Sequence, residues 1–332
     1  MSQYSEAHEN PNGPGDARPT AMQIIRDEGL IDGLKGQAIV ITGISSGIGI
    51  ETARALAATG ADLFLTARNV SKARSALADF YDPQRMDIIE MDQADLSSVR
   101  HAASAILART CKVHLLVENA GIMAIPDLRL TSDGHELQFA TNHLAHFLLF
   151  KLLQPALLAA ASESLPSRVV ILSSSGHNLH GLNSRDNYNF QKDDYDPFSA
   201  YGQSKTANIY TSNEIERRFG SRHLHSTSIH PGIIATGLTQ HMPPDAFEGM
   251  EQLYPVMKSV EQGAATSVLA AVGKSWKHQG GKYVADCNTA PPRADKDDAF
   301  TSSGYAQHAY DEEKATGLWE DSLVLVGLHG RE

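Results

Sequence analysis

The sequence predicts an α/β fold: one domain built on a doubly wound parallel sheet of about seven strands, with helices on both faces. Short β-branched segments alternate with longer Ala- and Leu-rich segments from Gly36 onward, which is the pattern of consecutive strand–helix–strand units. The expected strands are almost continuously apolar, as they are in a sheet covered on both faces. A glycine-rich turn also follows the first strand and opens a segment with a helical pattern.

The expected strands can be placed in order along the chain, and no linker divides them. The most evident are at 38–42, 62–66, 86–91, 113–117, 168–172 and 225–230. The segments between them are long enough for right-handed crossover helices. The most apolar segment, at 146–161, is interrupted by Lys151, Gln154 and Pro155, so we expect a buried helix there rather than a membrane span.

Three segments depart from this alternation. Residues 1–20 are polar and rich in Pro, Gly and Asn, so we expect a mobile tail before a domain at 21–332, without an apolar run typical of a signal peptide or membrane anchor. Residues of about 175–200 are turn-rich and are expected to form an inserted loop. The segment at about 237–260 is expected to cover the substrate, although lid or core packing explains its apolar side chains equally well: Leu238, Met242, Phe247, Met250 and Leu253.

Charge and cysteine content exclude several classes of function. The formal charge is −11 and no Lys/Arg run is concentrated, which argues against nucleic acid or an anionic membrane as the main partner. Two cysteines, Cys111 and Cys287, are too few for a disulfide framework, and we expect a cytoplasmic protein. His177 and His180 lack a nearby set of carboxylates or cysteines, so no metal is expected and a local polar or substrate contact is favoured for His177.

The turn after the first strand, TGISSGIG, is typical of a dinucleotide-binding, Rossmann-type sheet. Glycines let the backbone approach a pyrophosphate, and the free N–H groups of the following helix complement its charge. A tight turn that serves helix packing alone is the other explanation, but a strand before and a helix after favour binding. The residues expected to contact the cofactor here are Gly43, Ser45, Ser46, Gly47, Ile48 and Gly49.

The end of the second strand indicates which dinucleotide is bound. An NAD site usually has a carboxylate here for the ribose 2′-hydroxyl, whereas a 2′-phosphate needs a cation. The chain reads TARN, with Ala67 at the acidic position and Arg68 beside it. NADP(H) is therefore favoured, and the alternative interpretation of Arg68 is a solvated surface arginine.

A tyrosine followed four positions later by lysine occurs four times, and sequence context has to distinguish the copies. Helical spacing puts both side chains on one face, where an ammonium lowers the pKa of a phenol. The copy in YGQSK is followed by a long helical pattern, whereas the copy in YNFQK runs into a proline after a few residues, so we favour the former. The four pairs are Tyr188 and Lys192, Tyr201 and Lys205, Tyr254 and Lys258, and Tyr310 and Lys314.

Taken in order, these motifs resemble those of the short-chain dehydrogenase/reductase family over about residues 21–332. The ordered set is TGISSGIG, ENAG at 118–121, a serine after the fifth strand, YGQSK and HPG at 230–232. RVVILSSSGH, AYGQSKTANIY and GGKYVADC look most like its retinol-dehydrogenase-like branch. The resemblance implies a nicotinamide-dependent oxidoreductase.

The resemblance also assigns residues. It implies a catalytic tetrad of Asn142, Ser174, Tyr201 and Lys205, with Asn142 supporting a water that relays protons to Lys205. The chain departs from the family at Glu118 and Ile171, where many members have asparagine. Besides Arg68, Tyr201 and Lys205, the implied cofactor contacts beyond the glycine turn are Asp92, Gln93, Asn119, Ala120, Gly121, Pro231, Gly232, Ile234 and Thr236.

We therefore expect interconversion of a carbonyl and an alcohol on a lipophilic small molecule, in the reductive direction because cellular NADP is mostly reduced. A tailoring step of secondary metabolism is one setting. The alternatives are a non-redox or isomerising enzyme on the same scaffold, or a catalytically silent NADP-binding regulator. Helices near 135–160 and 200–218 pair in many family dimers, so a homodimer is a further expectation.

Overall fold

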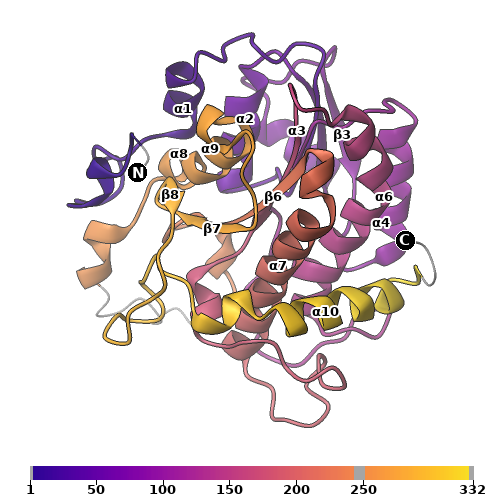
Figure 1. The fold of residues 1–332 in the computed structure, drawn as a ribbon, viewed down its shortest axis with the longest axis vertical. Helices are drawn as coiled ribbons and strands as arrows, with labels where there is room; N and C mark the ends of the chain where they lie inside the picture. Colours follow the sequence, from indigo (N-terminus) through magenta and orange to yellow (C-terminus); the bar gives the residue numbers. More distant parts are fainter. Residues whose placement is uncertain (1–2, 243–250, 329–332) are drawn as a thin grey trace.

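A computed structural model describes residues 3–242 and 251–328, which form one eight-stranded sheet in the order β3-β2-β1-β4-β5-β6-β7-β8 (Figure 1). All neighbouring strands are parallel except β7 and β8. The predicted doubly wound α/β fold is confirmed, with each of the six placed strands present. The strands are β1 (Ala38–Thr42), β2 (Asp62–Ala67), β3 (Met86–Glu90), β4 (Leu115–Glu118), β5 (Ser167–Leu172), β6 (Leu224–His230), β7 (Lys282–Ala285) and β8 (Asn288–Thr289).

Helices connect the strands, and several begin at a side chain that caps their free N–H groups, as the Asp95 carboxylate does for α4. The α-helices are α1 (Ala21–Asp27), α2 (Ile48–Ala57), α3 (Val70–Ala76), α4 (Leu96–Leu107), α5 (Leu137–Phe139), α6 (Ala145–Ala160), α7 (Pro197–Phe219), α8 (Val260–Gly263), α9 (Ala265–Val272) and α10 (Glu312–Leu325). Short 3₁₀ turns are η1 (Glu6–His8), η3 (Ser175–Asn178), η4 (Gly220–Arg222), η5 (Gly237–Thr239), η6 (Glu251–Val256), η7 (Lys274–Trp276) and η8 (Gln307–Tyr310), and η2 (Ala140–Leu144) is π-helical.

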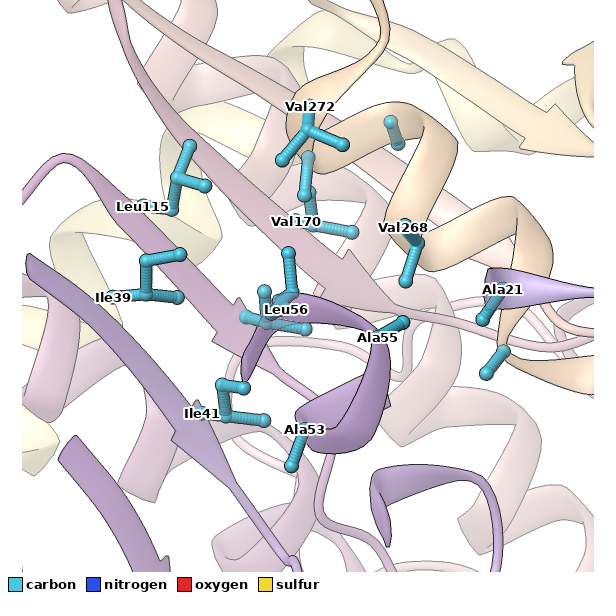
Figure 2. Packing of buried hydrophobic residues seen from close by; sticks show 14 of the residues in the cluster. Ala21, Ile39, Ile41, Ala53, Ala55, Leu56, Leu115, Val170, Val268 and Val272 are labelled. Carbon is cyan, nitrogen blue, oxygen red and sulfur yellow. The ribbon is translucent and has the colours of Figure 1, made fainter. Parts of the chain in front are cut away.

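The two faces of the sheet carry separate cores. Successive side chains of a strand point to opposite faces, so Ile39 and Ile41 pack toward α1, α2 and α9 (Figure 2), whereas Val40 packs toward α4, α6 and α7. Both sets are fully buried. This two-sided burial is the physical reason why the strands are almost continuously apolar.

The run Leu137–Ala160 is apolar and long enough to cross a membrane by length and composition alone. In the structure, about two-thirds of the most apolar part of this run is buried inside the protein. Phe147, Leu149 and Phe150 have no exposed surface and belong to the core on the α6 side of the sheet. The expectation of a buried helix at 146–161 is therefore met by α6.

The described part of the N-terminal segment, residues 3–20, is packed onto the domain where the sequence predicted a mobile tail. Tyr4 is buried and donates a 3.0 Å hydrogen bond to the Asp27 carboxylate. Arg18 is only 3% exposed and donates to main-chain carbonyls that include that of Val256 at 2.9 Å. This correction rests on contacts between segments about 240 residues apart, which polar composition cannot reveal.

Helix α10 lies across α7 (Figure 1) and covers part of the helical surface on which the homodimer expectation depends. Trp319 makes edge-on contacts with Phe147 at 5.0 Å and Phe150 at 6.1 Å between ring centroids. The Arg218 guanidinium stacks on the same indole at 4.7 Å. Part of the surface of α6 and α7 is thus covered by α10 of the same chain.

Candidate active site

The carboxyl ends of β1 and β4 are the place where a sheet of this strand order can hold a ligand. The chain runs from β1 outward through β2 to β3, then returns to β4 on the other side of β1. Ligands of open α/β sheets bind where the strand order reverses in this way. The glycine turn after β1 and residues 119–121 after β4, both expected to contact the cofactor, meet at this point.

Close packing explains the glycines of this turn. A Cβ on Gly49 would lie 2.2 Å from the Gly43 carbonyl oxygen, and one on Gly43 would lie 2.7 Å from the Ala120 Cα. The Asn119 amide nitrogen donates to the carbonyl oxygens of Thr42 at 2.8 Å and Gly43 at 3.0 Å. Asn119, expected to contact the cofactor, therefore also holds the turn in shape.

The remaining residues expected around the cofactor fit a dinucleotide. Ser46 is exposed and Ser45, Gly47 and Ile48 are half-buried at the start of α2. A Cβ on Gly47 would lie 3.3 Å from Thr236 Cγ2, so the segment after β6, with the half-buried Pro231, Gly232 and Ile234, faces the turn. The free N–H groups at this helix start suit a pyrophosphate held between these two segments.

The groups at the ends of β2 and β3 suit the adenosine half of the ligand. Arg68 is exposed just after β2, and no hydrogen bond or ion pair of its side chain occurs within the described residues. After β3, Asp92 is half-buried and accepts a 2.9 Å hydrogen bond from the Ala94 N–H. The Gln93 amide nitrogen is buried without a partner among the described residues, which leaves a donor for a bound base.

Helix α7 carries Tyr201 and Lys205 because its start is fixed by the sequence just before them. The Asp196 carboxylate accepts a 2.7 Å hydrogen bond from the Ser199 N–H, and Pro197 occupies the first helical position. One helical turn separates the two side chains, and the Lys205 ammonium lies 5.6 Å from the Tyr201 ring centroid. Lys205 also donates a 3.1 Å hydrogen bond to the Leu172 carbonyl oxygen.

Ser174 lies beside the Tyr201 ring. A Cβ on Gly176 would lie 2.7 Å from the Tyr201 ring and 3.5 Å from Ser174 Oγ, so the two side chains are neighbours. Burial raises the pKa of Tyr201 to about 12, and a hydrogen bond with Ser174 acts in the opposite direction. In this state the phenol is protonated at neutral pH and available as a proton donor.

Asn142 sits in the π-helical turn η2, a type of irregularity that often marks functional sites. Its side-chain oxygen accepts from the Ile122 N–H at 2.8 Å, and its amide nitrogen donates to Ser204 Oγ at 2.9 Å. A Cβ on Gly121 would lie 3.2 Å from Asn142 Oδ1 and 3.4 Å from Lys205 Nζ. The structure therefore brings Asn142, Lys205 and the end of β4 together.

A buried histidine that sequence reasoning missed connects this tetrad to the glycine turn. His146 Nδ1 lies 2.9 Å from the Asn142 carbonyl oxygen and must donate to it, so Nε2 accepts from the Thr42 hydroxyl at 2.9 Å. Thr42 Oγ1 in turn accepts from the main-chain N–H groups of Asn119 and Ala120. Burial lowers the pKa of His146 to about 4, which keeps this tautomer neutral. The only sequence signal is its i+4 position after Asn142.

The other tyrosine–lysine pairs have structural partners. Tyr188 stacks on Phe139 at 5.1 Å and donates a 2.8 Å hydrogen bond to Asp321. Tyr254 is 58% exposed on η6, and the Tyr310 hydroxyl accepts a 2.9 Å hydrogen bond from the Tyr283 N–H. Within the described residues, Tyr201 is the member of the four that lies beside Ser174.

His177 contacts the serine turn rather than open space. It has no exposed surface, and its ring nitrogens bond to the Ser174 carbonyl oxygen at 2.6 Å and the Ala306 N–H at 3.0 Å. A substrate contact, one of the two roles expected for His177, is therefore excluded by burial. The local polar role is present, because His177 ties the Ser174 turn to the C-terminal segment.

An apolar wall packs around the Tyr201 side chain, and the sequence predicted only part of it. Met123 and Ala124 pack with Tyr201, and Phe198, Leu238 and Met242 pack against this group. Leu238 and Met242 were expected to cover the substrate, whereas Phe247 and Met250 lie outside the described residues. Met123 and Ala124 follow ENAG directly in the chain, which was the available signal.

The inserted loop begins as η3 and ends at Asp196, four residues before its expected end, because α7 starts at Pro197. Hydrogen bonds of Tyr195 hold this loop beside the apolar wall. The Tyr195 hydroxyl donates to the Ile125 carbonyl oxygen at 2.9 Å and accepts from the Gln138 amide at 3.0 Å. These contacts place the insertion next to the end of the segment that follows β4.

Glu118, one of the two departures from the family pattern, is a buried carboxyl at the end of β4. It has no exposed surface, and neither of its oxygens has a hydrogen-bond partner among the described residues. Its register partner across the sheet is Ile171, the other departure. Burial raises the pKa of Glu118 to about 8, so this carboxyl is mostly protonated at neutral pH.

Comparison with known proteins gives a consistent family. The family described as short chain dehydrogenase matches residues 37–247. The short-chain dehydrogenase/reductase prx1 of Penicillium roqueforti is 44% identical over 328 residues, 98% of this chain and 95% of that protein. Oxidoreductase calI of Penicillium decumbens is 40% identical over 345 residues, 99% of this chain and 98% of that protein. The human WW domain-containing oxidoreductase is 34% identical over 96% of this chain and 75% of its own length.

Solved structures agree on the fold. An uncharacterized protein from Mycobacterium paratuberculosis aligns with a TM-score of 0.69 and 29% identity, covering 94% of this chain and 98% of that one. The NADP complex of Pseudomonas aeruginosa RhlG aligns with a TM-score of 0.62 and 24% identity, covering 77% and 96%. At this identity the second likeness concerns the fold alone.

Proposed function

The chain belongs to the short-chain dehydrogenase/reductase family, whose members use NAD(P)(H), and we propose that it interconverts a carbonyl and an alcohol with NADP(H). The observation that carries this proposal is that Tyr201 and Ser174 lie side by side next to Gly176, with the Lys205 ammonium 5.6 Å from the Tyr201 ring centroid. A silent NADP-binding regulator needs only the glycine turn and the phosphate contacts, so this arrangement favours an enzyme.

The residues of this chain account for the proton half of the reaction. The bound cofactor supplies a hydride to the carbonyl carbon. Tyr201 gives its proton to the carbonyl oxygen, while Ser174 donates a hydrogen bond to that oxygen and holds it in place. Because a nearby cation stabilises the phenolate, a protonated Lys205 lowers the pKa of Tyr201 as the proton leaves.

Asn142 is proposed to support the return of a proton to Tyr201 by way of Lys205. The Asn142 main-chain oxygen accepts a hydrogen bond from His146 Nδ1 at 2.9 Å, which fixes this part of the helix. The side chain of Asn142 is fixed by Ile122 and Ser204. An Asn142 side chain fixed in this way next to Gly121 and Lys205 can support the water that the family resemblance implies.

Cofactor preference is expected to depend on Arg68. Replacing Arg68 by Ala should weaken NADPH binding by about 10- to 100-fold, the effect of losing one charge-assisted hydrogen-bond donor to a phosphate, and leave NADH binding nearly unchanged. Fluorescence titration of both cofactors against both proteins measures this. Equal loss for NADPH and NADH would contradict a 2′-phosphate site, and Arg74→Ala on the neighbouring helix α3 is the control.

Cofactor binding is expected to take up a proton through Lys205. Burial lowers the pKa of Lys205 to about 7, and the negative charge that a bound dinucleotide brings would raise it. At pH 8 the free enzyme is then mostly unprotonated at this site and the complex protonated, so up to about one proton is taken up. Calorimetry in two buffers of different ionisation enthalpy measures it. A Lys205→Met variant with the same uptake would contradict this assignment.

The apolar wall of Met123, Ala124, Phe198, Leu238 and Met242 supports a lipophilic substrate. The retinol-dehydrogenase-like motifs support the same class, and we propose a cytoplasmic reductase, in the setting of a tailoring step of secondary metabolism. The two cysteines are free thiols, as a reducing compartment requires.

The direct test is NADPH consumption with a panel of lipophilic aldehydes and ketones. Consumption with formation of the matching alcohol supports the proposal. If NADPH binds and no carbonyl is reduced while a substrate is isomerised or rearranged, the non-redox alternative on the same scaffold is favoured. Binding without any turnover would favour the regulator.

A further inference from the structure

The lysine of the unused YPVMK motif lies directly behind the turn after β6, whose residues are expected to contact the cofactor. Lys258 is 4% exposed, and its N–H donates to the Ile233 carbonyl oxygen at 2.8 Å. Gly232 has a φ of +102°, and a Cβ there would lie 2.9 Å from Lys258 Cδ and Cε. The Lys258 side chain therefore forms the surface against which this turn packs.

The Lys258 ammonium is fixed from the other side by Asp286. Its Nζ lies 2.7 Å from Asp286 Oδ1, in the tight turn between β7 and β8. Burial opposes ionisation of Asp286, but the Lys258 charge and the Ser303 hydroxyl together hold its pKa below the ordinary value. Lys258 is buried while Asp286 is half-buried, and the ion pair together with the Ser303 hydrogen bond fixes the position of the ammonium.

The N-terminal arm, residues 3–20, holds the segment that precedes Lys258. Arg18 donates to the carbonyl oxygens of Val256 at 2.9 Å and Pro255 at 3.4 Å, and also to that of Met257. Gln262, at the start of α8, bonds through its amide to the arm at Asp16 Oδ1, 3.0 Å, and at the Arg18 carbonyl oxygen, 3.1 Å. The arm thus fixes both ends of residues 255–262.

The same short stretch packs on both cofactor segments. A Cβ on Gly263 would lie 2.8 Å from Ile234 and 2.9 Å from Ile48, the former after β6 and the latter at the glycine turn. A displacement of residues 255–263 would therefore move the two segments that face each other across the expected pyrophosphate. Packed interiors transmit such shifts because they contain little free volume.

We propose that Lys258 is a positioning residue for the segment 231–236, and that Arg18 of the N-terminal arm is its distant anchor. The inference rests on the proposed use of this segment to bind NADP(H). Neither side chain touches the reacting atoms. Loss of either is expected to weaken cofactor binding without slowing the chemical step once the cofactor is bound.

The experiment compares Lys258→Met and Arg18→Met with Arg168→Met. Arg168 is a similarly buried cation that donates to main-chain carbonyl oxygens at the end of α9, at the opposite end of the sheet. Each protein is titrated with NADPH, and KM for NADPH and kcat at saturating cofactor are measured in the reductase assay. Thermal unfolding reports the general loss of stability, which all three variants are expected to share.

We expect about a tenfold rise in Kd and KM for NADPH in Lys258→Met and a several-fold rise in Arg18→Met, within the range for residues that act on a ligand through packing. The kcat at saturation should stay within about twofold of wild type. If Lys258→Met does not fold, Asp286→Asn replaces it in the experiment, because it removes the charge of the Lys258 partner and keeps its size. This variant should also raise Kd for NADPH. Unchanged Kd in these variants, or an equal rise in Arg168→Met, would overturn the inference. Failure of the wild type to bind NADPH would instead overturn the proposed cofactor.

Discussion

Replacing Tyr201 by Phe is expected to lower kcat by about 10²- to 10⁴-fold, the usual contribution of a positioned general acid. The substitution removes one oxygen from a ring that is 4% exposed and leaves its packing against Met123 and Ala124 in place. The proton donor is lost, while the other residues that would hold the cofactor are untouched. Steady-state turnover of NADPH with the best carbonyl substrate measures the effect.

The matched control is Tyr188→Phe, because Tyr188 has the same spacing to a lysine. It removes the hydrogen bond to Asp321 and should lower stability modestly without changing kcat. NADPH titration and thermal unfolding of Tyr201→Phe must resemble those of the wild type for the result to count. Undiminished turnover in a folded, NADPH-binding Tyr201→Phe would show that another group is the acid.

Replacing Glu118 by Gln is expected to raise the free energy of unfolding by about 3 kcal/mol at pH 7. Burial raises the pKa of Glu118 from 4.5 to about 8. Because the pKa is raised in the folded protein, Glu118 does not reduce the free energy of unfolding below about pH 4.5, where it is protonated in both the folded and the unfolded state. The free energy of unfolding then falls as the pH rises from 4.5 to 8, because ionisation of Glu118 stabilises the unfolded chain and not the folded protein. Gln is neutral and of similar size, so it removes this decline.

Urea unfolding of wild type and Glu118→Gln at pH 5 and pH 8 measures the difference. The two proteins should be close in stability at pH 5 and separate at pH 8, and the exposed Glu163→Gln should show no such separation. A pH-independent difference would mean that Glu118 is ionised in the folded protein, held by a cation or a water that compensates its charge.

Short-range patterns determined the strands, the glycine turn and the choice among the tyrosines. Strand–helix alternation located β1 to β6 because burial on both faces requires continuous apolar runs. The choice of Tyr201 over Tyr188 rested on local features: a helical pattern on one side and a proline soon after the other. The grouping of Ser174, Tyr201, Lys205 and Asn142 came instead from the family resemblance. In the structure these four residues are neighbours at the end of the sheet.

Contacts between distant segments were decided only by the tertiary structure. Arg18 donates a hydrogen bond to the Val256 carbonyl oxygen, Trp319 packs edge-on against Phe147, and His146 accepts a hydrogen bond from the Thr42 hydroxyl. The N-terminal arm was predicted to be mobile because its polar composition indicates a large loss of conformational entropy on ordering. Composition does not show the tertiary contacts that offset this loss. Periodicity reports which residues are buried, since burial repeats along one element. It does not report what buries them, because that depends on where segments hundreds of residues apart meet.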